Sequence, residues 1–204
     1  MNFEEVLKTR KSIRKYKKKA VSKATIGRLV NAARLAPSSH NVQPWHFIVV
    51  SGKSKEKVVK VLEKASLNKK EMLFIRMILK PAIEIIRKAP LVILIFSKDH
   101  LKEKLSKFTK YFGKNSGEWK KVVEDASDWT TQSTSCAIQN MLLEAHSMGL
   151  GGVWLGITLS QKATLQKIFK TKNNFQGIVT VGYPDERPKK TKRYSISEVL
   201  SYYD

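Results

Sequence analysis

Residues 32–50 read AARLAPSSHNVQPWHFIVV and combine the end of a helix, a polar loop and a buried strand. The helix is predicted to run from a Ser22 cap to Pro37, which cannot continue it. Its apolar face has helical spacing, at Ile26, Leu29, Val30 and Ala33. The run HFIVV (46–50) is typical of a buried strand. The loop between them would present neutral hydrogen-bonding groups from a rigid support, which suits a heterocyclic ligand. Ordinary turn chemistry around Pro37 and Pro44 is the alternative.

Working outward, three further apolar runs predict strands: LVILIF (91–96), GVWLGI (152–157) and GIVTVGY (177–183). The strands are too far apart along the chain for hairpins, and helical patterns separate them. The helices expected are a short one after Asn2 with Phe3, Val6 and Leu7 facing inward, one opened by Ser54, Met72–Lys88 with a kink at Pro81, about 118–148, and Ser160–Phe169. The tail, 184–204, reads as basic and then weakly helical. This pattern predicts an α+β fold in which helices wrap a small central, mostly antiparallel sheet.

The predicted helix at 118–148 has a long apolar side. That side contains Trp119, Val122, Val123, Ala126, Ile138, Met141, Leu142, Ala145 and Met148. A domain built from 204 residues cannot easily bury so much nonpolar surface by itself. A helix–helix interface in a homodimer is therefore expected.

Composition sets the broad class of the protein. With 42% hydrophobic residues, no internal repeat and no Gly/Ser-rich linker, residues 1–204 are expected to form one domain, with about 97–118 as an excursion or lid. The one cysteine, Cys136, excludes an intrachain disulfide and is expected to be a buried thiol, which fits a cytoplasmic protein. No secretory signal is seen at the N-terminus. Charged residues recur through 72–88, so no transmembrane segment is expected.

The net charge of +22, from 39 basic and 17 acidic residues, has two explanations. One is an anionic partner such as nucleic acid, an acidic membrane or a phosphorylated ligand. The other is a solvated, lysine-rich surface, which is favoured because the lysines are scattered along the whole chain. The sequence contains no helix-turn-helix, RNA-binding aromatic motif or zinc module, so nucleic-acid binding is not expected.

Three more segments have residue types suited to ligand contacts. TRKSIR (9–14) places three cations and a hydroxyl just after a short helix, and arginine presents a planar fork of donors to phosphate. GLGGVWLG (149–156) has glycines on both sides of a strand, where backbone can approach a flat ligand, but it is not a phosphate loop. RPKKTKR (187–193) follows the last strand. Each segment alone is also compatible with a solvated loop or a helix end.

Together, in this order and spacing, the four segments resemble the nitroreductase family of flavoproteins. The family's opening Arg-[Arg/Lys]-Ser-[Ile/Val]-Arg run is matched at 10–14, and its Ala-Arg-x-Ala-Pro-Ser helix end and following loop at 33–45. Its Gln-Asn-x-Leu-Leu-x-Ala-x-x-x-Gly-Leu-Gly helix is matched at 139–151, and its Val-Gly-Tyr-Pro strand end at 181–184. Residues of about 52–118 are poorly matched.

The resemblance implies a homodimer that binds one FMN per subunit in a cleft at the interface. The residues expected to hold the flavin from one subunit are Arg10, Lys11, Ser12, Arg14, Leu155, Gly156, Lys192 and Arg193. Those expected to reach it from the partner subunit are Pro37, Ser38, Ser39 and Asn41, with Gln43 in the same loop. NADH or NADPH would give a hydride to flavin N5, and an oxidised acceptor such as a nitroaromatic, quinone or enone would then take it. A cation beside the N1/O2 edge of the flavin would favour the charge that reduction places there.

Some features depart from the family or leave alternatives open. Many relatives have an aspartate where this chain has Ser133. No catalytic side chain and no metal site are expected, because the histidines form no readable triad or metal-ligand cluster. His40 and His46 flank the 37–45 loop, where surface roles are favoured over pocket lining. The alternatives to the enzyme are a basic nucleic-acid-binding protein and a flavin-binding protein without catalytic activity.

Overall fold

The structure, a computed structural model, describes residues 1–67, 73–98, 117–156, 161–189 and 191–203. Within the helices, the side chains of 75, 76, 117–120, 122–124, 126 and 127 are outside that description. The elements are α1 (Phe3–Thr9), α2 (Lys23–Arg34), η1 (Ser39–Asn41), β1 (Trp45–Val50), α3 (Gly52–Leu67), α4 (Leu73–Lys88), β2 (Leu91–Ser97), α6 (Gly117–Ser147), β3 (Gly151–Leu155), α7 (Lys162–Ile168), β4 (Asn174–Gly182) and α8 (Ile196–Val199).

The four described strands form one sheet in the order β1-β2-β4-β3, and every neighbouring pair is antiparallel. β2 and β4 are central, which explains why their runs are almost wholly buried. The prediction of an α+β fold with a small antiparallel sheet is confirmed. The expected excursion at 97–118 lies mostly outside the described residues.

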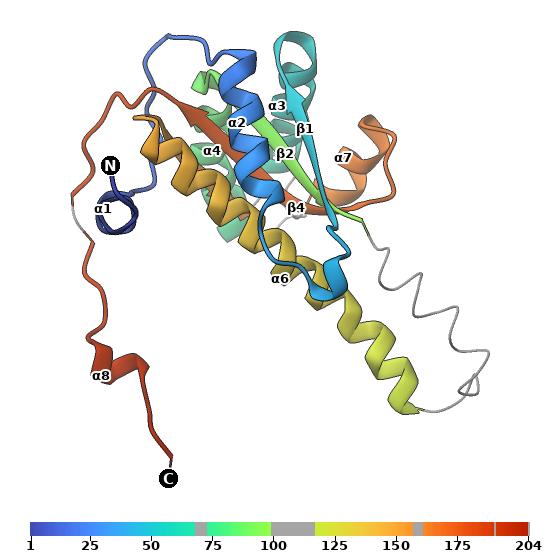
Figure 1. Cartoon of the computed structure of the whole chain (residues 1–204). Coiled ribbons are helices and arrows are strands. Elements are labelled where there is room, and N and C mark those ends of the chain that lie inside the picture. The colour runs from blue at the N-terminus through green and yellow to red at the C-terminus, as the bar shows by residue number, and fades with distance from the viewer. Residues whose placement is uncertain (68–72, 99–116, 157–160, 190, 204) are drawn as a thin grey trace.

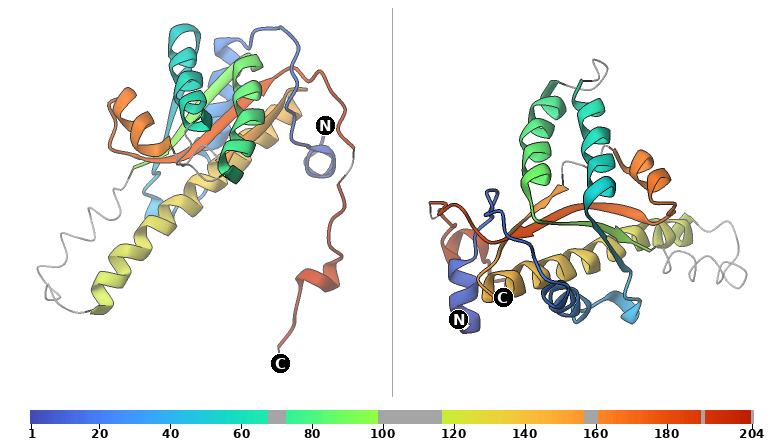
Figure 2. Two further views of the ribbon diagram at one scale, coloured as in Figure 1. Left: turned by 180° about the vertical axis from the view of Figure 1, so that it is seen from behind. Right: turned by 90° about the horizontal axis from the view of Figure 1, so that it is seen from above.

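Helices cover both faces of the sheet (Figures 1 and 2). Alternate residues of β2 point to opposite faces, as the two-residue period of a strand requires. Val92, Leu94 and Phe96 pack into the core with α3 and α4, whereas Ile93 and Ile95 pack into the core with α2 and α6. The 32–50 segment thus places α2 on one face and β1 at the sheet edge, with the polar loop between them.

Among the described elements, the predicted boundaries hold to within about three residues, and β4 shows one of the largest differences. This strand begins at Asn174, three residues before the predicted start at Gly177. A β-bulge explains the difference, because Ile95 pairs with Gly177 but Phe96 pairs with Phe175. Gly177 has φ +118°, and the indole of Trp154 and the carbonyl of Leu155 fill the space where a side chain would stand. Because the bulge interrupts the two-residue period of the strand, the residues before Gly177 do not continue the apolar pattern from which the strand was predicted.

The expected caps are present, but one predicted helix face is wrong. Asn2 accepts a hydrogen bond from the backbone N–H of Glu5 at 2.9 Å, and Ser22 from that of Thr25 at 3.1 Å. In α1 only Val6 is buried; Phe3 is 71% exposed and Leu7 50% exposed. α1 lies at the edge of the molecule beside the C-terminal tail (Figure 1). Only a narrow side of this helix therefore packs against the rest of the chain.

The apolar side of α6 is used mostly within its own chain. Ala137, Ile138, Met141, Leu142 and Ala145 are buried against α2 and the sheet. The expected apolar positions 119, 122, 123 and 126 lie outside the described side chains. Within the described side chains, these five residues are therefore not free for a helix–helix interface, and the expected interface stays a prediction.

Candidate functional site

The opening basic run is fixed beside the start of β3 and the end of β4. The backbone N–H of Ile13 donates to the carbonyl of Gly152 at 3.1 Å, and that of Lys17 donates to the carbonyl of Tyr183 at 2.9 Å. Tyr16 is buried, and its hydroxyl donates to the Ile13 carbonyl at 2.6 Å. Burial raises the pKa of the Tyr16 phenol, so the hydroxyl keeps its proton. The basic run therefore meets two other segments that the sequence analysis named, 149–156 and 181–184.

Gly151 is required for this close approach. A Cβ at this position would lie 2.3 Å from Cγ1 and 2.7 Å from Cβ of Ile13, and the second atom cannot move without moving the backbone. The glycines before β3 let the basic run lie directly against the strand.

Gly151→Ala is therefore expected to lower the free energy of unfolding by about 1–3 kcal/mol through overpacking against Ile13. Gly27→Ala is the matched control, because nothing lies within 4 Å of its Cβ position and it sits inside a helix. That control should be neutral or stabilising by roughly 0.5–1 kcal/mol. Chemical denaturation of both variants measures the difference, and equal stability of the two would contradict the packing described here.

Glu186 binds the backbone of the basic run, a contact that was not predicted from the sequence. Its Oε1 accepts from the backbone N–H of Arg14 at 2.5 Å and from that of Lys15 at 3.1 Å. Lys11 Nζ donates to the carbonyl of Pro188 at 2.8 Å. Within the described residues, neither Arg10 nor Arg14 has its guanidinium in an ion pair. The run is held by backbone and lysine contacts, and its two arginines remain available to an anion.

A second contact joins the run to α6. Thr9 Oγ1 and His146 Nε2 are 2.7 Å apart, and Thr9 Oγ1 also donates to the carbonyl of Glu5 at 2.6 Å. Burial lowers the pKa of His146, and the positive charge of Arg10 lowers it further. His146 at neutral pH is therefore an uncharged neighbour of Arg10.

The polar loop after α2 and the part of α6 that it contacts, residues 129–136, form a second group of residues. A pocket of about 350 Å³ is lined by Pro37, Ser38, Ser39, His40, Trp129, Gln132, Ser133 and Cys136. The backbone N–H of Ser39 donates to Ser133 Oγ at 3.3 Å, which ties the loop to the helix. No side chain of that lining is an acid, a lysine or an arginine, which matches the neutral polar surface expected from the sequence.

The loop has an unusual backbone. His40, Asn41 and Gln43 have φ of 48°, 51° and 44°, in the left-handed region that non-glycine residues seldom adopt. Such conformations are held in place by their surroundings and occur often at ligand sites. Here Ser38 holds them, since its carbonyl accepts from Asn41 N at 3.0 Å and its Oγ from Gln43 N at 3.1 Å. The side chains of Asn41 and Gln43 are exposed.

The two groups do not meet within one chain. The basic run contacts α6 at His146, and the polar loop contacts it at Ser133. Thirteen residues of helix at ~1.5 Å each separate these contacts by roughly 20 Å. Within one chain, the basic run and the polar loop therefore form two separate groups.

The remaining predicted residues are placed as follows. Leu155 is buried at the end of β3, and Gly156 follows it. Leu155 lies about 10 Å along the strand from Gly152, at ~3.3 Å per residue. Lys192 and Arg193 are exposed in the tail, where Arg193 donates to Thr191 Oγ1 at 2.7 Å and to the Lys192 carbonyl at 3.2 Å.

One prediction about a single residue was wrong. Cys136 is exposed and lines the pocket, although a buried thiol was expected. Its neighbours Ala137 and Ile138 are fully buried, so the helix turns the cysteine to the opposite side from the core. His40 also lines the pocket, whereas His46 has its Nδ1 3.1 Å from Asn173 Nδ2. The α6 residues of the pocket recur at helical spacing (129, 132, 133, 136), a signal that the sequence did contain.

The described residues contain neither a metal-ligand cluster nor a membrane-spanning helix. No group of three or more His, Cys, Asp or Glu side chains is placed to hold a metal ion. No helix in the described part of the chain is long and apolar enough to span a membrane.

The chain is similar to known proteins over most of its length. The family model described as the nitroreductase family matches residues 7–183. A Methanothermobacter thermautotrophicus protein named as an NADH dehydrogenase/NAD(P)H nitroreductase is 30% identical over 192 residues, covering 92% of this chain and 80% of that protein.

Solved structures share the fold. A BluB-like flavoprotein from Clostridium difficile superimposes with a TM-score of 0.83 at 22% identity, covering all of both chains. A Desulfovibrio desulfuricans nitroreductase in complex with FMN gives a TM-score of 0.71 at 24% identity, covering 100% of this chain and 98% of that chain. The match of the family model across most of the sequence, together with the 30% identical relative, shows that this chain belongs to the nitroreductase family.

Proposed function

We propose that the protein is an FMN-dependent oxidoreductase that takes a hydride from NADH or NADPH and delivers it to an oxidised acceptor. The observation that carries the proposal is the basic run of a nitroreductase-family chain, fixed against β3 while Arg10 and Arg14 remain without an ion pair among the described residues. The names of relatives support the donor and the cofactor, since one is an NAD(P)H nitroreductase and another is a complex with FMN.

The residues present fit FMN. Arg10, Lys11, Ser12 and Arg14 offer charge-assisted and neutral donors to a phosphate and to the pyrimidine edge. The neutral loop at 37–43 suits the uncharged ring, because a charged lining would lose its solvation against a heterocycle. Bound FMN would supply the hydride-accepting and hydride-donating atom, so no protein side chain has to act as acid, base or nucleophile.

The chain's own part in the reaction is electrostatic and positional. Lys11 or Arg14 would place a fixed positive charge beside the edge of the ring that becomes negative on reduction. Lys11 is already oriented by its bond to the Pro188 carbonyl, so little reorganisation would accompany the charge. Leu155 and Gly156 would set the depth of the ring at the end of β3.

We also propose a homodimer, which the separation of the two groups supports. They lie roughly 20 Å apart along α6, so a flavin held by the basic run of one subunit would meet the 37–43 loop of the partner subunit. Exposed apolar side chains of α1 and the tail give such a dimer surface to bury; they are Phe3, Leu7, Tyr194, Ile196, Val199, Leu200, Tyr202 and Tyr203. This apolar surface is separate from the α6 face that was expected from the sequence.

Cofactor content and turnover test the proposed function. The purified full-length protein, supplied with FMN, should hold about one flavin per chain and oxidise NADH or NADPH in the presence of a quinone or nitroaromatic. Flavin binding without NAD(P)H oxidation would point to a non-catalytic flavin protein. No flavin binding at all would overturn the proposal.

We further propose a cytoplasmic location, because the one cysteine fits a reducing compartment.

A further inference from the structure

The helical hairpin of α3 and α4 projects from the face of the sheet opposite α2 and α6. In Figure 2, the end where α3 finishes and the end where α4 begins both point away from the sheet. The buried residues of these helices, such as Val58, Leu62, Leu79 and Ile86, anchor the hairpin to the core. Nothing in the proposed flavin site uses the projecting end.

Large apolar side chains gather at that end. Leu67 is 70% exposed, Leu73 68%, Phe74 64% and Met77 63%. They are the last residue of α3 and the first turns of α4. Single exposed apolar residues are common on protein surfaces, but four at one projecting end indicate a surface that contacts something apolar.

Lysines continue both helices behind the apolar end. Lys60, Lys64 and Leu67 are spaced i, i+4, i+7 on α3, and Leu73, Met77 and Lys80 have the same spacing on α4. Leu67 and Lys80 line one groove between the helices, so these two stripes lie side by side. Lys60, Lys64 and Lys80 are exposed and, among the described residues, form no ion pair.

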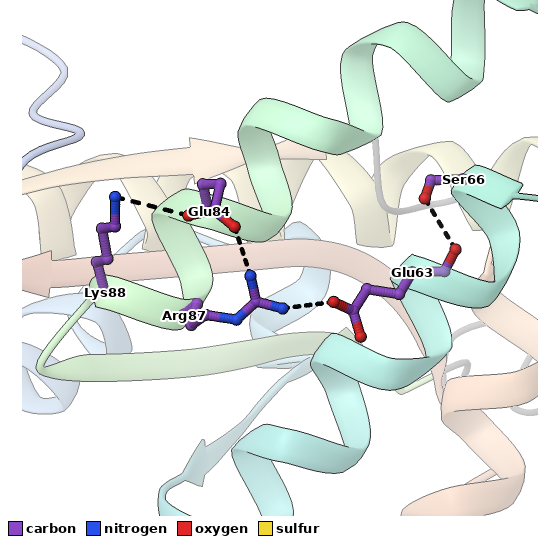
Figure 3. A network of polar contacts seen from close by, with 5 residues as sticks. All are labelled: Glu63, Ser66, Glu84, Arg87 and Lys88. Atoms are coloured by element: carbon purple, nitrogen blue, oxygen red, sulfur yellow. Dashed lines mark hydrogen bonds and ion pairs between the residues drawn. The ribbon is translucent and has the colours of Figure 1, made fainter.

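Two acidic residues of the hairpin, Glu63 and Glu84, are paired with cations. Arg87 donates to both Glu63 and Glu84, and Lys88 Nζ lies 3.5 Å from Glu84 (Figure 3). This network joins α3 to α4, and within the described residues it takes no charge from Lys60, Lys64 or Lys80. Lys55 Nζ adds a further tie from α3 to the Arg87 carbonyl at 2.8 Å.

We propose that the α3–α4 end, formed by Leu67, Leu73, Phe74 and Met77 with Lys60, Lys64 and Lys80, docks on an anionic lipid surface. Apolar side chains would enter the headgroup boundary, and the lysines behind them would meet the lipid phosphates while their stems lie along the apolar surface. The net charge of +22 adds long-range attraction to such a surface. An acidic protein or a nucleic-acid partner would not need four apolar side chains, and an apolar protein partner would not need the lysines.

Sedimentation with vesicles tests the proposal on the full chain. The wild type should bind mixed vesicles of phosphatidylglycerol and phosphatidylcholine, and it should bind vesicles of phosphatidylcholine alone much less. Leu73→Ser/Phe74→Ser/Met77→Ser should lower the partition coefficient about tenfold or more, and should remove the binding that survives high salt. Lys60→Ala/Lys64→Ala/Lys80→Ala should lower it on the order of a hundredfold at low ionic strength.

Two controls separate docking from general attraction. Val49→Ser removes an apolar side chain that is 44% exposed on β1 and should bind as the wild type does. Phe74→Trp keeps the apolar end, and its added fluorescence should be quenched by vesicles of brominated lipid. Equal vesicle binding by the serine triple variant and the wild type would overturn the proposal. So would a wild-type mass in light scattering that the serine variant halves, because the apolar end would then bind a second copy.

Discussion

Replacing Arg10 and Arg14 together by alanine is expected to weaken FMN binding by about a thousandfold, leaving a colourless protein. A charge-assisted hydrogen bond contributes roughly 1.5–3 kcal/mol, and about 1.4 kcal/mol is a factor of ten in affinity. The fold should survive, because the run is held by Ile13, Tyr16 and Glu186 and not by the two guanidiniums. Isothermal titration with FMN measures the loss.

The matched control removes the same charge from the same segment. Lys18 and Lys19 are exposed and follow the run, so Lys18→Ala/Lys19→Ala also lowers the net charge by two. Steering by net charge acts at long range, so this control should change FMN affinity by no more than a few fold. Retention of stoichiometric FMN by the arginine variant would show that the phosphate is bound elsewhere.

A bulky residue in the polar loop is expected to weaken FMN binding strongly, although the loop lies far from the basic run. Ser39 lines the pocket of about 350 Å³, and Ser39→Trp would fill much of it. Steric overfilling costs about 1–3 kcal/mol, or roughly a ten- to hundredfold loss of FMN affinity, although His146 beside the basic run is some 20 Å away.

Leu35→Trp is the control for the added indole. Leu35 is 68% exposed just before the loop and is not part of the pocket lining, so its replacement should leave FMN affinity unchanged. Equal affinity of the Ser39 and Leu35 variants would show that the pocket does not face the flavin.

Much of the fold could be predicted from the sequence because the relevant signals are local. The β2 run LVILIF is fully buried and central, and the Ser22 cap and the end of α2 follow directly from residue types. Features that depend on distant contacts were missed. The bulge at Gly177 and the exposure of Phe3 and Leu7 are set by what packs against them, which a single-sequence pattern does not contain.

The candidate site shows the same division. The basic run and the polar loop were found as motifs, because arginines and small polar residues have recognisable chemistry in short segments. Glu186 was missed since its partners, the backbone N–H groups of Arg14 and Lys15, lie about 170 positions earlier and leave no mark in the sequence. The helical spacing of residues 129, 132, 133 and 136 could be recognised in the sequence. That this side of α6 faces the pocket depends on which side of the helix the loop covers, which the spacing alone does not show.

Mixing the two defective chains tests most directly whether two subunits build one flavin site. The Arg10→Ala/Arg14→Ala chain and the Ser39→Trp chain, co-expressed with different affinity tags, are purified as the heterodimer that carries both tags. One of its two sites then combines the intact basic run of one chain with the intact loop of the other. The account predicts about half the FMN content of the wild-type dimer, while each mutant homodimer binds almost none. A heterodimer as empty as its parents would contradict it, because the site would then lie within a single chain.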